Sequence, residues 1–190
     1  MDLEFISDQE YINRDFSKDQ LPKGEYDNCT FINCNFSKTH LSGVQFIDSS
    51  FEQCDLSLSK IKDTAFKEIS FKSCKLLGIR FDECNPFLLA LSFNDCILNF
   101  SNFYKLRLKN STFKGCKIHE VEFSKSDLTN VIFDNCELNA SKFENTILEK
   151  TDFRTSINFD IDPELNRMKK AKFSQSELSG LLNKYDLEIE

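Results

Sequence analysis

The feature that most constrains this chain is an apolar residue at every fifth position. From Tyr11 to Phe153, 29 successive positions of this kind hold Phe, Leu, Ile or Tyr, with one shift of two residues after Phe81. A spacing of five matches neither the period of about 3.6 of an α-helix nor the period of about 2 of a strand. A fixed period sustained over most of a chain is typical of solenoids, in which each repeat packs on its neighbours. The sequence therefore predicts a solenoid.

A second column, of small or β-branched residues, lies two positions before the apolar one, and the other three positions are mostly polar. Large and small residues that recur together predict a narrow interior, in which rings occupy the axis and small side chains fill the gaps. Stacked β-type coils lie roughly 4.8 Å apart, so about seven coils would give a rod of about 34 Å. Coils of 20 residues place one residue type in a single core column: Phe31, Phe51, Phe71, Phe93, Phe113, Phe133 and Phe153.

This pattern resembles the pentapeptide-repeat family, whose consensus is a small residue, a polar residue, Leu or Phe, and two variable residues. Good copies in this chain are CTFIN, CNFSK, CDLSL, CKLLG, SKFEN and TDFRT. The resemblance implies an all-β fold, a right-handed quadrilateral parallel β-helix, to which the tail adds a short C-terminal α-helix. We expect an N-terminal cap over residues 1–10, the β-helix over residues 11–158 and a C-terminal cap over residues 159–190.

All eight Cys fall on the small inward position, and two sets of three are spaced by 20 residues. None has the spacing of a zinc site. Neighbouring coils could bring two thiols to disulfide distance, but we expect reduced thiols that fill the core. The acidic N-terminus does not resemble a signal peptide, and no apolar run is long enough to span a membrane. These observations predict a cytoplasmic protein without a metal site.

The shift of two residues lies near residues 82–87, where Pro86 falls on an inward position. Proline cannot donate to a β-ladder, so we expect a bulge or a small loop here. Apolar residues off the core columns surround this break, and an exposed apolar cluster is typical of a partner site. Local packing under the bulge is the alternative. The candidate partner surface is Leu58, Leu77, Phe87, Leu89, Phe100 and Tyr104.

After Phe153 the repeat ends, and the tail carries a capping box formed by Ser174 and Glu177. Four apolar residues then recur at helical spacing and predict an α-helix over 175–185: Leu178, Leu181, Leu182 and Tyr185. A helix this short needs a surface to pack on, which is either the end of the solenoid or a second copy. The tail is similar to the DP…N…A-x-F…L…GLL ending of the Qnr-type quinolone-resistance group, which implies a homodimer interface at these four residues.

No arrangement of residues in the sequence points to catalysis. His40 and His119 lie beside inward positions, are far apart in the sequence, and have no second His nearby. There is no Gly-rich phosphate loop and no nucleophile motif. We therefore expect no catalytic residues, no cofactor and no small-molecule substrate.

The formal net charge is −7, and residues 1–30 carry eight acidic residues against three basic ones. An acidic rod disfavours direct binding to nucleic acid but suits a basic surface of another protein. Resemblance to the Qnr-type group implies a DNA-mimic that binds DNA gyrase or topoisomerase IV and protects it from quinolones or gyrase poisons. The outward charges are mixed, which leaves open the alternative of a protein-interaction scaffold with an unrelated protein partner.

Overall fold

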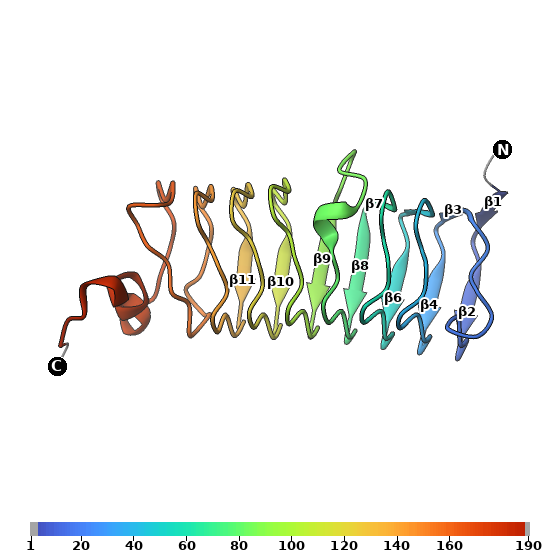
Figure 1. Cartoon of the computed structure of the whole chain (residues 1–190), viewed down its shortest axis with the longest axis horizontal. Helices are drawn as coiled ribbons and strands as arrows, with labels where there is room; N and C mark the ends of the chain where they lie inside the picture. The colour runs from blue at the N-terminus through green and yellow to red at the C-terminus, as the bar shows by residue number, and fades with distance from the viewer. Residues whose placement is uncertain (1–3, 189–190) are drawn as a thin grey trace.

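The computed structural model describes residues 4–188 and forms a single long rod (Figure 1). The chain winds around the long axis in successive coils, with the first strand at one end and the tail at the other. All paired strands are parallel and belong to two sheets that follow two sides of the rod. This is the parallel β-solenoid that the fivefold spacing predicts, and that prediction is confirmed.

The first sheet has seven strands, in the spatial order β11-β10-β9-β8-β6-β4-β2. Its strands are β2 (Glu10–Ile12), β4 (Thr30–Ile32), β6 (Ser50–Glu52), β8 (Ile69–Lys72), β9 (Leu91–Asn94), β10 (Thr112–Lys114) and β11 (Ile132–Asp134). The second sheet has four strands, in the order β1-β3-β5-β7. These are β1 (Glu4–Ser7), β3 (Gly24–Asp27), β5 (Gln45–Ile47) and β7 (Ala65–Lys67).

Each coil has four sides, which we number along the chain from the seven-stranded sheet. Sides two and three are held by single bridges, such as Asn35↔Asp55 and His40↔Lys60. Side four begins as the four-stranded sheet and continues beyond β7 as single bridges, such as Arg107↔Asp127. Bridged partners are 20 residues apart in the regular part of the chain. The ladder runs past residue 158, since Asp152 still pairs with Lys172.

At the corners, one residue adopts a left-handed backbone conformation and turns the chain onto the next side. Asn13, Asn28 and Asn33 are examples, with φ between 50° and 53°. Asn and Asp tolerate this conformation better than other non-glycine residues, which is why they recur there. The corner N–H then donates to the next coil, as from Asn33 to the carbonyl of Glu52 at 2.9 Å.

The interior is a stack of aromatic rings. Side one alone carries Tyr11, the seven Phe of the predicted column and Phe173, with successive ring centroids 4.8–5.3 Å apart and planes within 20° of parallel. Rings from other sides meet this stack edge-on, as Phe103 meets Phe113 at 6.1 Å. Both offset stacking and edge-to-face contacts are favourable aromatic geometries. The seven Phe of the column are at most 1% exposed.

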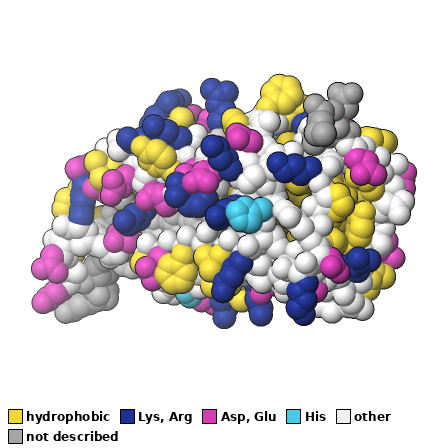
Figure 2. All heavy atoms as spheres, turned by 45° about the vertical axis from the view of Figure 1, so that its right-hand side comes forward, with side chains coloured by type: hydrophobic (Ala, Val, Ile, Leu, Met, Phe, Trp, Pro, Cys, Tyr) yellow, Lys and Arg dark blue, Asp and Glu magenta, His cyan; other side chains and the backbone are white. Residues whose placement is uncertain are grey.

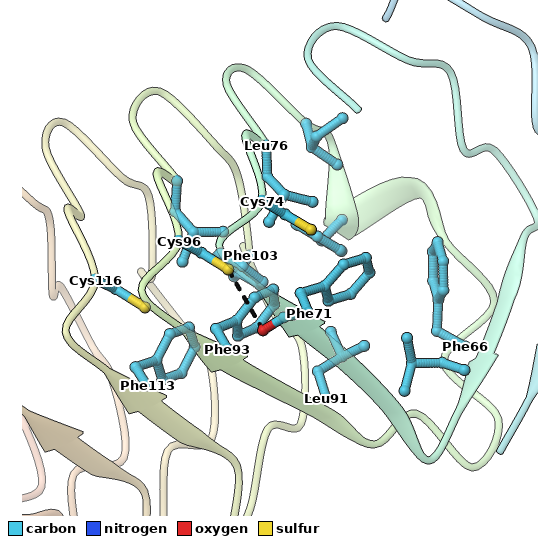
Figure 3. Packing of buried hydrophobic residues seen from close by; sticks show 14 of the residues in the cluster. Phe66, Phe71, Cys74, Leu76, Leu91, Phe93, Cys96, Phe103, Phe113 and Cys116 are labelled. Atoms are coloured by element: carbon cyan, nitrogen blue, oxygen red, sulfur yellow. Dashed lines mark hydrogen bonds between the residues drawn. The ribbon is translucent and has the colours of Figure 1, made fainter. Parts of the chain in front are cut away.

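The cysteines lie beside this stack, and Figure 3 shows three of them along successive coils next to Phe71, Phe93 and Phe113. The Cys96 thiol donates to the carbonyl of Phe71 at 3.4 Å. All eight thiols are buried and unbridged, so the prediction that the cysteines fill the core is confirmed. Burial raises the pKa of Cys84 to about 12, which keeps that thiol protonated.

The register break differs from the prediction in one detail. The shift of two residues after Phe81 predicts Leu88 on the inward column, but its side chain is 63% exposed and its backbone is left-handed. Asn85 still pairs with Ala65 at the old spacing, whereas Leu91 pairs with Ile69 at a spacing of 22. The extra residues therefore leave the coil as a loop at 86–90. Proline in this loop has no N–H to give to the ladder. The buried Leu91 lies two residues before Phe93, at the inward position that Ile69 holds before Phe71.

The tail is helical where the sequence predicts a helix, but its helices are 3-10 and not α. They are η2 (Gln175–Leu181) and η3 (Asn183–Tyr185); a third 3-10 turn, η1 (Phe81–Glu83), precedes the loop. Ser174 makes no side-chain cap, so the predicted capping box does not form. The carbonyl of Gly180 accepts the N–H of Ile161 at 2.9 Å. In an α-helix this carbonyl would accept the N–H of the fourth residue ahead. Here it accepts a hydrogen bond from a residue outside the helix.

Candidate functional site

The six residues of the candidate partner surface lie at three places on the rod. Leu58, Leu77 and Phe100 are at or beside the corner between sides two and three. Phe87 and Leu89 are in the loop at 86–90, which follows the start of side four and leads onto side one. Tyr104 is on side three, between the two other places. The structure therefore divides the predicted surface into separate parts.

Leu58, Gly78 and Phe100 follow one another on successive coils, and together with Leu77 they form what we call the corner ridge. The Leu58 N–H donates to the carbonyl of Leu77 at 2.9 Å, and the Phe100 N–H donates to that of His119 at 2.9 Å. Leu58 and Phe100 are each 56% exposed. A Cβ at Gly78 would lie 2.8 Å from Cδ2 of Leu58. Glycine therefore leaves the room into which the Leu58 side chain leans.

The ridge residues break two local rules at once. Leu58 and Phe100 have φ of 58° and 64°, a conformation that is unusual for bulky residues. They also expose large apolar side chains on a surface that is otherwise mostly polar. Neither choice helps the chain to fold or to stay soluble. Residues that break local rules without a structural gain are expected at functional sites.

The loop at 86–90 carries the most exposed aromatic side chain of the described residues, Phe87, at 66%. It protrudes from the top of the rod in Figure 1, in green. The Phe87 N–H donates to Oδ1 of Asn85 at 2.9 Å, and Leu89 is half-buried against the core. Beside the loop is an open hollow of about 340 Å³, lined by Glu68, Ile69, Ser70, Ala90, Leu91, Ser92, Lys109, Asn110, Ser111 and Thr112.

Tyr104 does not join either apolar surface. Its ring faces two ammonium groups, with Lys105 Nζ at 5.0 Å and Lys125 Nζ at 5.5 Å from the ring centroid. Such cation–π contacts are favourable at exposed sites. Lys125 lowers the pKa of the Tyr104 hydroxyl.

Of the four residues expected at a dimer interface, two point outward. Leu178 is 42% and Tyr185 is 50% exposed. Leu181 packs against the core of the same chain, and Leu182 is half-buried. The tail thus covers the end of the solenoid and still presents apolar side chains beyond it.

Ionic contacts fasten the tail to the segment before it. Lys184 Nζ lies 2.8 Å from Asp162 and 2.6 Å from Glu164, and the Tyr185 hydroxyl donates to Glu164 at 2.8 Å. The ammonium of Lys184 lowers the pKa of both carboxyls. Gly180 lies so close to Phe159 that a Cβ there would meet the ring at 2.8 Å.

Charged side chains of both signs alternate over the face drawn in Figure 2, with hydrophobic side chains between them. His119 Nε2 lies 3.1 Å from Glu137 Oε2, and His40 is exposed. Within residues 4–188, no three His, Cys, Asp or Glu side chains are grouped as metal ligands. No helix of this part of the chain is long and apolar enough to cross a membrane.

Sequence reasoning missed Leu88 as an exposed residue, and it did not single out the lysines around the corner ridge. Alignment of the coils in steps of 20 would have placed Lys38, Lys60 and Lys75 beside the ridge columns. The exposure of Leu88 depends on where the ladder resumes after the break, which is at Leu91, and the spacing alone does not decide that.

Comparison with known proteins agrees with this architecture. A family profile described as "Pentapeptide repeat region" matches residues 9–86 and 88–158. No curated protein matches the chain significantly. A trypsin-treated form of QnrB1, a plasmid-mediated fluoroquinolone resistance protein, matches with a TM-score of 0.64 and 17% identity over 100% of both chains. Full-length QnrB1 matches with a TM-score of 0.54 and 17% identity, over 96% of this chain and 100% of that one. At this identity the match shows a shared fold.

Proposed function

The chain belongs to the pentapeptide-repeat family, and from this we propose that it is a non-enzymatic protein that binds another protein through the outside of its rod. The observation that carries the proposal is the filled interior, in which stacked rings 4.8–5.3 Å apart occupy the axis of the rod. Inward residues therefore determine the fold, and recognition is left to the corners, the loop and the tail. Exposed Phe87 and Leu88 are the kind of anchor that protein interfaces use.

The partner that we propose is a type II topoisomerase, DNA gyrase or topoisomerase IV, which the rod would protect from quinolones or gyrase poisons. Three observations support this proposal: the fold shared with QnrB1 over the full length of both chains, the Qnr-like ending of the tail, and a net charge of −7. A rod of this shape and charge would approach the basic surface on which such an enzyme holds DNA.

A second candidate is a cytoplasmic scaffold for an unrelated protein partner. The observation that favours it is the mixed charge of the outward column on side one, which would mimic a phosphate backbone poorly. That column reads Ile32, Glu52, Lys72, Asn94, Lys114, Asp134 and Arg154.

A supercoiling assay with purified DNA gyrase, with and without a fluoroquinolone, tests the first candidate against the second. We expect the protein to restore supercoiling in the presence of the drug. A variant with Phe87→Ser and Leu88→Ser should lose this effect, and the matched control Ile132→Ser, a change of another exposed residue on side one, should retain it. If the protein neither binds gyrase, nor inhibits it, nor restores supercoiling, the topoisomerase proposal is wrong and the scaffold remains.

A further inference from the structure

The corner ridge has a charged rim of its own. On side two, three residues before the corner, the coils carry Asp55, Lys75, Ile97 and Lys117; on side three, two residues after it, they carry Lys60, Arg80, Asn102 and Glu122. The corner positions before and after the ridge are Lys38 and Glu120. Basic residues therefore outnumber acidic ones around the ridge, although the whole chain is acidic.

Most of these basic groups are free to meet a partner. None of the ion pairs among residues 4–188 involves Lys60, Lys75 or Lys117, and all three side chains are exposed. Arg80 differs, since it already pairs with Asp82 at 2.7 Å. The exposed apolar groups of the ridge are thus bordered by unpaired ammonium groups.

We propose that the corner ridge is a docking surface for an acidic protein segment that presents apolar side chains. The apolar part of such a segment would cover Leu58, Leu77 and Phe100, and its carboxylates would meet Lys60, Lys75 and Lys117. Complementary charge selects the partner and orients it, while desolvated apolar anchors supply affinity. This surface is separate from the loop at 86–90 and does not depend on the topoisomerase proposal.

The left-handed backbone of the ridge allows a test that leaves the fold intact. Asn occupies equivalent corners elsewhere, at Asn110 and Asn130, with φ of 61° and 59°. Since Asn tolerates this conformation better than Leu or Phe, the variant Leu58→Asn with Phe100→Asn should melt at the same temperature as the wild type or higher. Loss of binding in this variant would then report the surface and not unfolding.

The probe is a fluorescein-labelled peptide in which Leu and Phe alternate with Asp and Glu, measured by fluorescence anisotropy. One comparison peptide replaces its acids by Lys, and another replaces its apolar residues by Ser. We expect the acidic apolar peptide to bind most tightly and more weakly at high salt. The Asn double variant and the variant Lys60→Glu with Lys75→Glu should each weaken it by about tenfold or more. The control Ile132→Asn should bind as the wild type does.

Two outcomes would overturn the proposal. In the first, the three peptides bind equally, or the Asn double variant binds the acidic peptide as tightly as the wild type. In the second, vesicles of anionic phospholipid bind the protein and the acidic peptide does not. Neither measurement involves a topoisomerase, so a failure here leaves the supercoiling test unaffected.

Discussion

At the scale of the residue, two positions in each pentapeptide do most of the structural work. The inward Phe or Leu meets the same residue of the next coil, and the left-handed corner residue turns the chain. Phe113 shows how tightly the first position is held, since its ring centroid lies 4.9 Å from those of Phe93 and Phe133. The corner tolerates more variety, because its side chain points into solvent. Leu58 and Phe100 show that this freedom also admits large apolar residues.

Replacing Phe113 by Ala should lower the free energy of unfolding by about 3–5 kcal/mol. The ring is fully buried, and its removal leaves a cavity between two rings that cannot move together without breaking the coil spacing. Chemical denaturation of the purified variant measures the change. Ile132→Ala, which truncates a residue that is 46% exposed, is the matched control and should cost well under 1 kcal/mol. Equal losses in both variants would contradict the core role of Phe113.

At the scale of the element, the regular coils could be predicted from the sequence, and the exceptions could not. The spacing of five was sufficient to place Phe71 and Phe93 on neighbouring coils across the break, because it resumes beyond it. It also placed Leu88 on the inward column, whereas Leu88 lies in the loop and is exposed, because the ladder resumes only at Leu91. The 3-10 form of the tail was equally hidden, because it depends on the contact of Gly180 with a distant part of the chain.

The same limit applies to the candidate surface. Leu58 and Phe100 could be predicted to face outward, because they lie off the core columns. Their separation from Phe87 by a whole side of the rod depends on the order of the four sides and on the loop. The sequence therefore indicated which single residues are exposed. It indicated less reliably which of these exposed residues lie next to one another on the rod.

Near the C-terminal end of the rod, Asp152 makes ionic contacts that acid should weaken. The pKa of Asp152 is lowered from 3.8 to about 2. The main cause is the guanidinium of Arg154, and the ammonium of Lys172 on the next coil adds to it. At pH values above the ordinary pKa of a carboxyl, the lowered pKa means that ionised Asp152 stabilises the folded state. This contribution is lost as the pH falls from about 4 to about 2. Asp152→Asn should therefore lower the melting temperature at about pH 7 and have almost no effect near pH 2.

The size of this effect should be small, below about 1 kcal/mol, as for other ion pairs near a protein surface. Thermal melting of both proteins across this pH range measures it. In a background with Arg154→Ala and Lys172→Ala, the same Asp152→Asn change should cost less. A difference between wild type and variant that is independent of pH would contradict the ionic role.

At the scale of the whole molecule, the charge is concentrated at the two ends. Residues 1–30 carry eight acidic and three basic residues, a net of −5, and residues 174–190 carry four acidic and one basic, a net of −3. The part between them is therefore close to neutral. Association through either end must overcome repulsion between like charges, which salt screens.

If two copies associate through their tails, Leu178→Asp should convert the dimer into a monomer. Leu178 is 42% exposed, so the change leaves the packing of its own chain largely intact and adds a charge to the interface. Light scattering coupled to size-exclusion chromatography measures the mass, and higher salt should strengthen the wild-type dimer. Ile12→Asp, at the opposite end of the rod, is the control and should leave the mass unchanged. A wild type that is monomeric at high concentration would contradict the tail-mediated dimer.

The hydrogen bonds between coils run along the length of the rod, and this has a mechanical consequence. When the two ends of the rod are pulled apart, the hydrogen bonds of one coil break before those of the next. The solenoid therefore unfolds coil by coil, and not by the simultaneous rupture of many bonds that a sheet pulled in shear requires. Each coil that opens would release about 20 residues, or roughly 70 Å of slack chain. The rod thus resists a force across its long axis with all of its coils together. It is weakest against a force along that axis.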